Sequence, residues 1–167
     1  MANKEHLRRL KKTIDGLSDF KGWNRWRAAN RKIVPDLSGA NLGEIDLIGD
    51  TNLKGADLSF ADLFEASIEQ LRLKGANLEG ADLRFAQLWK ADLRDANLNS
   101  ADLTGASLEG ADMRGANLFS ARLENSKLAG ARLEGATAGY TIFANCDLRD
   151  VAGLQTVRHE GPSTIGG

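Results

Sequence analysis

Apolar residues recur along this chain at every fifth position over most of its length. The series begins at Leu37 and continues to Leu148 with a single interruption, and 19 of its 23 members are Leu. The other four are also apolar, namely Ile68, Met113, Ala138 and Phe143. A period of five fits neither an α-helix, which repeats every 3.6 residues, nor a strand, which alternates every two. The pattern therefore predicts a backbone that turns a corner every five residues, so that each apolar side chain returns to the interior.

The positions around each apolar centre follow a pattern of their own. Ala stands two residues before the centre in 16 of the 23 repeats, Asp or Asn often stands directly before it, and Gly often stands two residues after it. Ala is small enough to lie beside Leu in a narrow interior, and Gly suits a corner where φ is positive. The spacing is interrupted once, because Leu47 and Leu53 are six residues apart. We expect one extra residue to bulge outward within 48–52.

The two ends of the chain do not follow the repeat. At the N-terminus, Asn3 is a candidate N-cap for a helix, whose apolar face consists of Leu7, Leu10, Ile14 and Leu17. We expect a second short helix to carry Trp23 and Trp26. The chain is therefore divided into a basic α-helical N-terminal cap (1–34), a repeat domain (35–150) and a C-terminal tail or linker (151–167).

The repeat, with its consensus Ala-(Asp/Asn)-Leu-x-Gly, resembles the pentapeptide-repeat family from about Pro35 to Arg149. This resemblance implies an all-β solenoid, a right-handed quadrilateral β-helix of about six coils with a short α-helical cap at its N-terminal end. Each coil would contain four pentapeptides. Two sets of polar residues recur at the resulting spacing of 20 and should form ladders, namely Asn77, Asn97 and Asn117, and Asp62, Asp82 and Asp102. An Asn ladder can form hydrogen bonds within itself.

Both ends also resemble bacterial multidomain proteins in which a TIR-type signalling domain follows the pentapeptide repeats. Residues 23–27, with the sequence WNRWR, and the segment 151–167 carry this resemblance. It implies that the chain is the N-terminal module of a longer signalling or effector protein. The chain contains no TIR residues, so the activity of that domain cannot be transferred to it.

Charge is unevenly divided between the N-terminal segment and the repeat. Residues 1–34 contain ten Lys or Arg and three Asp or Glu, whereas residues 35–150 contain eleven and nineteen. The cations of the N-terminal segment belong either to a solvated cap or to a surface that faces an acidic partner. We favour the cap and do not expect direct binding to nucleic acid.

Three features predict a cytoplasmic protein without a membrane partner. Cys146 is the sole cysteine, so no disulfide can form within the chain. The N-terminus lacks the apolar stretch of a secretory signal. No run approaches the ~18 apolar residues that a membrane span requires.

The sequence contains no constellation that suits catalysis. Neither His6 nor His159 belongs to a pattern with metal-ligand spacing, and the glycines follow the five-residue corners rather than a phosphate-binding loop. A narrow solenoid filled with Leu also leaves no room for a concave pocket. We therefore predict that the protein is not an enzyme and has no catalytic, cofactor-binding or metal-binding residues.

Two surface features are candidates for binding a partner. Aromatic residues occupy outward positions in two neighbouring coils, namely Phe60, Phe64, Phe85 and Trp89. They are either covered by the N-terminal segment or available as anchors for a partner. The second feature is the row Asp62, Asp82 and Asp102, which stability alone would not favour because like charges repel. Surface charge without a role is the competing interpretation of this row.

Two functions fit these features. The first is a non-catalytic protein-interaction or scaffolding module with an unidentified protein partner. Such a module could also form a homodimer or associate end to end, because an uncapped solenoid end presents free backbone groups. The alternative is a DNA mimic that binds a type II topoisomerase, since some members of the pentapeptide-repeat family protect DNA gyrase by presenting an acidic rod. Fold alone does not choose between these functions.

Overall fold

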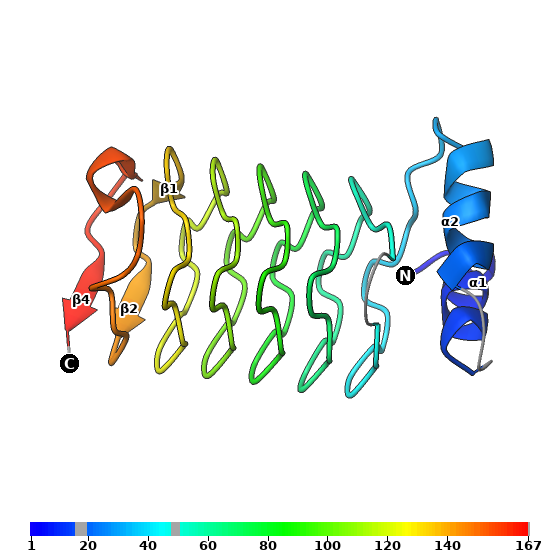
Figure 1. Ribbon diagram of the computed structural model, residues 1–167, viewed down its shortest axis with the longest axis horizontal. Coiled ribbons are helices and arrows are strands. Elements are labelled where there is room, and N and C mark those ends of the chain that lie inside the picture. Colours follow the sequence, from blue (N-terminus) through cyan, green and yellow to red (C-terminus); the bar gives the residue numbers. More distant parts are fainter. Residues whose placement is uncertain (16–19, 48–50, 167) are drawn as a thin grey trace.

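The protein is an elongated rod with two helices at one end. The computed structural model describes residues 1–15, 20–47 and 51–166. Figure 1 shows the N-terminal helices at one end of the rod, successive windings of the repeat along its length, and the C-terminal strands at the other end. The repeat therefore provides the body of the molecule.

Each pentapeptide ends in a tight turn. At one such corner the Ala61 N–H donates a hydrogen bond of 3.1 Å to the Leu58 carbonyl, and Phe60, between them, has a φ of 56°. The same position is Gly in other repeats, for example Gly75 with a φ of 65°. Since this left-handed conformation favours Gly, the corner geometry explains the glycine of the consensus and confirms the predicted positive φ.

Parallel bridges join each winding to the next. Asp62 bridges Asp82, which in turn bridges Asp102, so that partners are 20 residues apart and each winding has four pentapeptide sides. Near the start of the repeat the partners are 21 residues apart, as in the bridge between Asp36 and Asp57. One extra residue therefore lies in the first winding, as the spacing predicted. The predicted outward bulge falls largely on residues 48–50, which lie outside the described residues.

Most of this β-structure consists of isolated bridges rather than long strands. Within the described residues the strands are β1 (Thr137–Ala138), β2 (Ile142–Ala144), β3 (Arg158–His159) and β4 (Thr164–Gly166). Each side turns a corner after a few extended residues, so a longer ladder cannot form. The repeat thus makes a solenoid with little conventional sheet.

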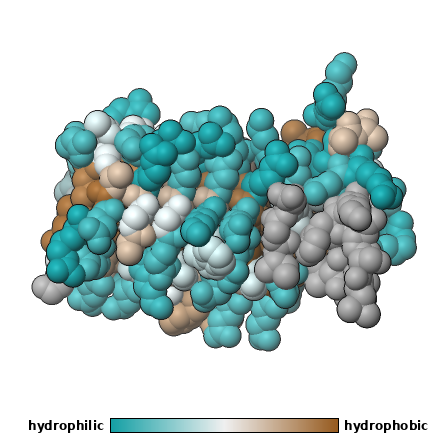
Figure 2. Space-filling view, viewed as in Figure 1, coloured by the Kyte–Doolittle hydropathy of each residue, from teal (hydrophilic) through white to brown (hydrophobic). Residues whose placement is uncertain are grey.

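The interior of the rod is filled by the apolar centres and the alanines beside them. Every centre of the repeat except Leu148 is buried, and Leu148 packs against the core while partly exposed. Apart from a few buried residues such as Thr51 and Thr141, polar side chains project outward, and Figure 2 shows a face that is mostly hydrophilic, with apolar residues visible between them. The predicted core of Leu and Ala is confirmed.

The N-terminal segment contains α1 (Lys4–Asp15) and α2 (Phe20–Ala29). The Asn3 side-chain oxygen accepts hydrogen bonds from the N–H groups of Glu5 and His6, at 3.0 and 3.2 Å, and so acts as the predicted N-cap. Leu10 is fully buried. The side chains of Ile14 and Leu17, predicted for the same face, lie outside the described part of the chain.

Side chains of the N-terminal segment bond to the backbone of the first windings. The buried Trp23 donates from Nε1 to the Asn52 carbonyl at 2.9 Å, and His6 Nδ1 accepts from the Asp36 N–H at 3.0 Å. The helices are therefore held against the end of the rod.

The segment after Asp150 remains part of the rod. It contains the 3-10 helix η1 (Leu154–Thr156), followed by strand β3, which pairs in parallel with β1, and strand β4, which pairs in parallel with β2. Although its sequence leaves the five-residue pattern, its backbone is hydrogen-bonded to the preceding winding.

Candidate binding surfaces

Phe64 and Phe85 meet at one corner of the rod. Their ring centroids are 5.9 Å apart with an interplanar angle of 83°, an edge-to-face contact. The guanidinium carbon of Arg84 lies 5.4 Å from the centroid of the Phe64 ring. Phe85 remains 49% exposed. Two aromatic rings and a cation are therefore side by side at the surface.

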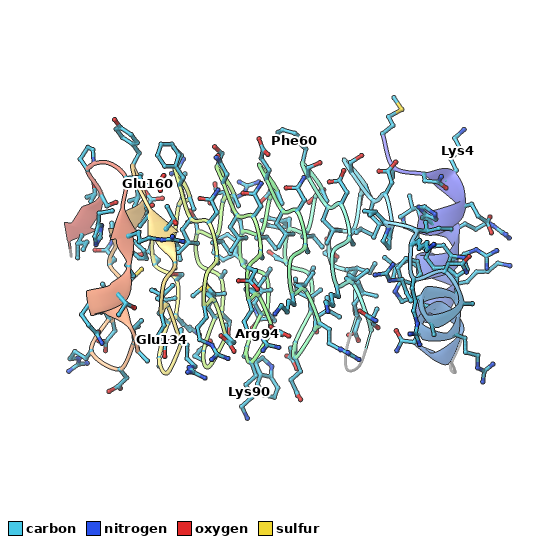
Figure 3. All side chains as sticks on the ribbon, turned by 90° about the horizontal axis from the view of Figure 1, so that it is seen from above. Lys4, Phe60, Lys90, Arg94, Glu134 and Glu160 are labelled. Carbon is cyan, nitrogen blue, oxygen red and sulfur yellow. The ribbon has the colours of Figure 1, made fainter. Side chains whose placement is uncertain are left out.

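Phe60 and Trp89 lie on other corners. Phe60 is 68% exposed, and its ring lies over Gly80, where an added Cβ would stand 2.6 Å from the ring. Trp89 packs beside Lys90, whose ammonium nitrogen is 5.0 Å from the ring centroid. Figure 3 shows Phe60 and Lys90 projecting from opposite sides of the rod. Of the four predicted aromatic residues, two meet, and the exposure of Phe60 and Phe85 means that the N-terminal segment does not cover these rings.

A second aromatic pair was missed in the sequence. Phe119 and Tyr140 also form an edge-to-face contact, with centroids 5.5 Å apart and an interplanar angle of 73°. These residues are 21 positions apart, as are Phe64 and Phe85. A spacing of one winding plus one residue is therefore the sequence signal for such corner pairs.

The acidic row forms as predicted but has a local structural role. Asp62, Asp82 and Asp102 bridge in sequence, and the row ends at Asn41 on one side and Arg122 on the other. Each carboxylate accepts the backbone N–H two residues later, at 3.0 to 3.1 Å. This is the Asx turn that short Asp and Asn side chains favour. The turn explains why Asp or Asn stands before so many apolar centres.

Arg84 reduces the repulsion within the row. It pairs with Asp82 through two hydrogen bonds, from Nε at 2.8 Å and from a terminal nitrogen at 2.6 Å. The hydrogen bond from Arg84 holds the pKa of Asp82 below its usual value. Repulsion among the three carboxylates was the reason to expect a functional role for the row, and this ion pair weakens that reason.

The predicted Asn ladder is confirmed. The Asn77 amide donates to Asp57 at 3.1 Å, Asn97 to Asn77 at 3.0 Å, and Asn117 to Asn97 at 3.1 Å. Asn77 and Asn97 thus each accept from the following winding and donate to the preceding one, whereas Asn117 ends the ladder as a donor. The ladder ties successive windings together through side chains as well as backbone.

Groups suited to metal binding are not assembled in the described residues. No group of three or more His, Cys, Asp or Glu in that part of the chain could hold a metal ion.

Cys146 is half-buried and donates from Sγ to the Leu123 carbonyl at 2.7 Å. No helix within the described ranges is long and apolar enough to cross a membrane.

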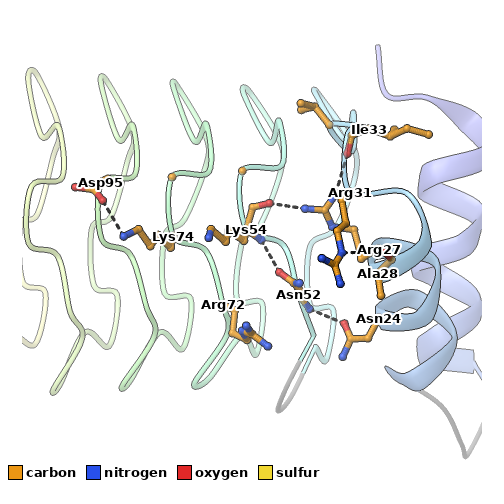
Figure 4. A pocket seen from close by; sticks show the side chains of 13 residues that line it. Asn24, Arg27, Ala28, Arg31, Ile33, Asn52, Lys54, Arg72, Lys74 and Asp95 are labelled. Atoms are coloured by element: carbon orange, nitrogen blue, oxygen red, sulfur yellow. Dashed lines mark hydrogen bonds and ion pairs between the residues drawn. The ribbon is translucent and has the colours of Figure 1, made fainter.

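A groove of about 660 Å³ lies between α2 and the first windings of the rod (Figure 4). The charged residues that line it come from both the N-terminal segment and the first windings, namely Arg27, Arg31, Lys54, Arg72, Lys74 and Asp95. The sequence predicted no concave pocket, which was wrong for this junction because the groove is built by helix packing rather than by the repeat. The lining residues are too far apart in the chain for spacing to reveal them.

The repeat matches a family model described as pentapeptide repeats (8 copies), over residues 36–66, 49–80, 76–115 and 116–151. Among curated proteins, none matches the chain. The resemblance of the two ends to TIR-type multidomain proteins finds no support in these comparisons.

Several solved structures of cyanobacterial proteins are similar to this chain. The pentapeptide repeat protein Rfr23 from Cyanothece 51142 is 25% identical, with a TM-score of 0.42, over 84% of this chain and 96% of its own. The pentapeptide repeat protein alr5209 from Nostoc Pcc 7120 is 32% identical, with a TM-score of 0.40, over 83% and 93%. HetL from Nostoc sp. Strain PCC 7120, involved in heterocyst differentiation regulation, is 35% identical, with a TM-score of 0.38, over 81% and 54%.

Proposed function

Because this chain belongs to the pentapeptide-repeat family, whose members fold as right-handed quadrilateral β-helices, we propose that it is a non-catalytic module that binds a protein partner. The binding surface is the corner that carries Phe64, Arg84 and Phe85. The observation behind this proposal is the exposed edge-to-face pair of phenylalanines next to a guanidinium group. Aromatic side chains and Arg are enriched at the centres of protein interfaces.

Stability alone does not favour Phe at this corner. Phe85 has a φ of 59°, a conformation that disfavours every residue with a Cβ and suits Gly. Its ring covers Gly105 of the next winding, yet half of the side chain remains in contact with solvent. The half-exposed apolar ring of Phe85, in contact with Phe64, supports a contact with a partner.

The other aromatic pair has a structural alternative. The Phe119 ring lies against Gly139, and the Tyr140 ring lies against Gly161 in the C-terminal segment. These rings therefore help to hold that segment on the rod. Tyr140 shares the positive φ and the exposure of Phe85, so Phe119 and Tyr140 provide a control matched in geometry to Phe64 and Phe85.

The rod is well suited to present such a surface. Backbone hydrogen bonds join each side to the winding before and after it, for example from the Leu83 N–H to the Asp102 carbonyl at 2.8 Å. A rigid surface loses little conformational entropy on binding, so more of the contact energy contributes to affinity.

The test is affinity capture from the source cells with three versions of the immobilised protein. These are the native chain, the Phe64→Ser/Phe85→Ser variant and the Phe119→Ser/Tyr140→Ser variant. We expect at least one protein to be retained by the native chain and by the second variant but lost with the first. The proposal is contradicted if every retained protein binds all three versions equally, provided that circular dichroism shows the variants folded.

The alternative function as a DNA mimic has weaker support. The acidic row contains three Asp residues, ends at Arg122, and includes Arg84 paired with Asp82. A DNA-like surface needs a longer run of unpaired negative charge. A DNA gyrase supercoiling assay at micromolar protein tests this function, and the absence of both inhibition and protection would exclude it.

We also propose that α1 and α2 cap a solenoid of about six coils. The bonds of His6 and Trp23 to the first windings support this role. A cytoplasmic location, a bacterial source and a connection to a TIR-type domain stay predictions. The intact mass of the protein captured from its source cells tests the last of these, since a further domain would raise the mass well above 18.0 kDa.

A further inference from the structure

The groove beside α2 concentrates positive charge from two distant parts of the chain. Arg27 and Arg31 come from the N-terminal segment, whereas Lys54, Arg72 and Lys74 come from the first windings of the rod. The repeat as a whole is acidic, but its first three cations all face this groove. The packing of α2 against the rod thus creates a basic surface in a concave site.

The cations in the groove are largely unbalanced. Lys74 forms an exposed ion pair with Asp95 at 3.3 Å. Within the described ranges, no carboxylate forms an ion pair with the four other cations, namely Arg27, Arg31, Lys54 and Arg72. Cations held close together without counter-charges repel one another, and an anion in the groove would relieve this repulsion.

Arg27 is fixed in position at the wall of the groove. Its two terminal nitrogens donate to the carbonyls of Ile33 at 2.9 Å and Lys54 at 2.6 Å, as Figure 4 shows. Its Nε is buried and has no hydrogen-bond partner in the described part of the chain. Burial also lowers the pKa of this guanidinium. A buried donor without a partner is costly, so Arg27 gains from any additional acceptor.

The rim of the groove adds an apolar contact surface. Ile33 and Val34 line it and are 42% and 61% exposed. The volume of about 660 Å³ falls within the range of sites for small molecules. A ligand that fits both features has several negative charges at one end and a less polar group at the other.

We propose that this groove binds a small ligand with linked phosphate groups, of the pyrophosphate or nucleoside diphosphate class. Guanidinium groups donate paired hydrogen bonds to phosphate oxygens, and lysines add point charges. Two linked phosphates offer enough oxygens to engage several of these cations together. The lining of the groove includes neither Phe64 nor Phe85, so the two proposed sites can be tested separately.

The experiment is isothermal titration calorimetry with two probes, pyrophosphate and ADP, on the complete chain. The test variant is Lys54→Ser/Arg72→Ser, which removes two groove cations whose side chains form no hydrogen bond or ion pair with the described residues. The control is Lys127→Ser/Arg149→Ser, which removes one Lys and one Arg far along the rod. A second test variant, Arg31→Ser, covers the case in which the double variant fails to fold.

We expect both probes to bind the native chain and the control with equal affinity, and the test variant to bind about tenfold more weakly or worse. Tighter binding of ADP than of pyrophosphate would indicate that the nucleoside contacts Ile33 and Val34. Equal binding would indicate that the groove recognises only the phosphates. Both results support the proposal.

Three results would overturn it. These are no binding at millimolar probe, equal losses in the test and control variants, and sulfate or citrate binding as tightly as pyrophosphate. A duplex DNA oligomer that binds far more tightly than ADP, and loses affinity in the same variant, would replace the small ligand with nucleic acid. The Phe64→Ser/Phe85→Ser variant should bind pyrophosphate normally, so a failure here is distinct from a failure of the proposed protein contact.

Discussion

Gly153 lies against the backbone of Glu134, so closely that a Cβ atom at position 153 would stand 2.5 Å from the Glu134 nitrogen. Gly153 also has a φ of 82°, which a residue with a Cβ rarely adopts. The adjacent Ala152 bridges Arg132 of the preceding winding. This close contact shows that the segment after the repeat packs as part of the rod.

The contact predicts a large effect of Gly153→Ala. Gly135 has a similar φ of 69°, but an added Cβ there meets nothing within 4 Å. We expect Gly135→Ala to lower the free energy of unfolding by about 1 kcal/mol through backbone strain. Gly153→Ala should lower it by about 1–3 kcal/mol more, because the added Cβ also clashes. Hydrogen exchange of the amides in 151–166 measures this, because a solenoid can open locally at its end. Equal exchange in the two variants would contradict the tight packing.

The Asx turns predict different effects of two changes at Asp82. Asp82→Asn keeps an oxygen that accepts the Arg84 N–H but loses the exposed ion pair, so the free energy of unfolding should fall by about 0.5 kcal/mol or less. Asp82→Ala also removes the acceptor and should cost about 1 kcal/mol more. Urea denaturation followed by circular dichroism provides the comparison. If Asn and Ala are equally destabilising, the charge of the row matters more than its turns.

The aspartates predict a loss of stability in acid. Hydrogen bonds from neighbouring arginines lower the pKa of Asp82, Asp92 and Asp112 below the usual 3.8, and lower that of Asp147 to about 2. A lowered pKa means that the folded state favours the charged carboxylate. Its contribution to stability is therefore complete above the usual pKa and is lost as the pH falls through the lowered one.

The urea midpoint of the native chain should therefore fall between about pH 4 and pH 2. Arg84→Gln removes the donor to Asp82 and should make this fall slightly shallower. A midpoint that stays constant or rises over this range would show that the arginine pairs contribute nothing to stability.

The buried Trp23 predicts that the helices can be released from the rod. Trp23 is 1% exposed, and Trp23→Ala removes both its packing and its hydrogen bond to the Asn52 carbonyl. We therefore expect the helices to lose about 3–5 kcal/mol of stabilising free energy. The loss should appear as a smaller helical signal at 222 nm and rapid proteolysis within residues 1–34. The rod should remain resistant, because its windings depend mainly on their neighbours. Trp89→Ala, at an outward corner beside Lys90, is the control and should leave the helices in place.

The period of five was sufficient to predict the interior of this protein. It predicted the burial of centres such as Leu83 and the positive φ of Gly75, whereas the hydrogen bond between Asn77 and Asn97 also required the coil of 20 residues that the family resemblance implied. Each depends on residues that are neighbours in the chain or lie at a constant spacing of 20. Because the same local geometry recurs in each repeat, the sequence pattern specifies it many times.

The contacts between non-repeating parts could not be read in the same way. The pattern grouped Phe60 and Trp89 with Phe64 and Phe85, but their places within the coil put them on different corners, and only Phe64 and Phe85 touch. The basic groove depends on where α2 docks against Lys54 and Arg72, and residues 151–166 join the rod without keeping its period. Such contacts form once, between segments far apart in the chain, so their geometry follows from the packing of the whole molecule rather than from any recurring spacing.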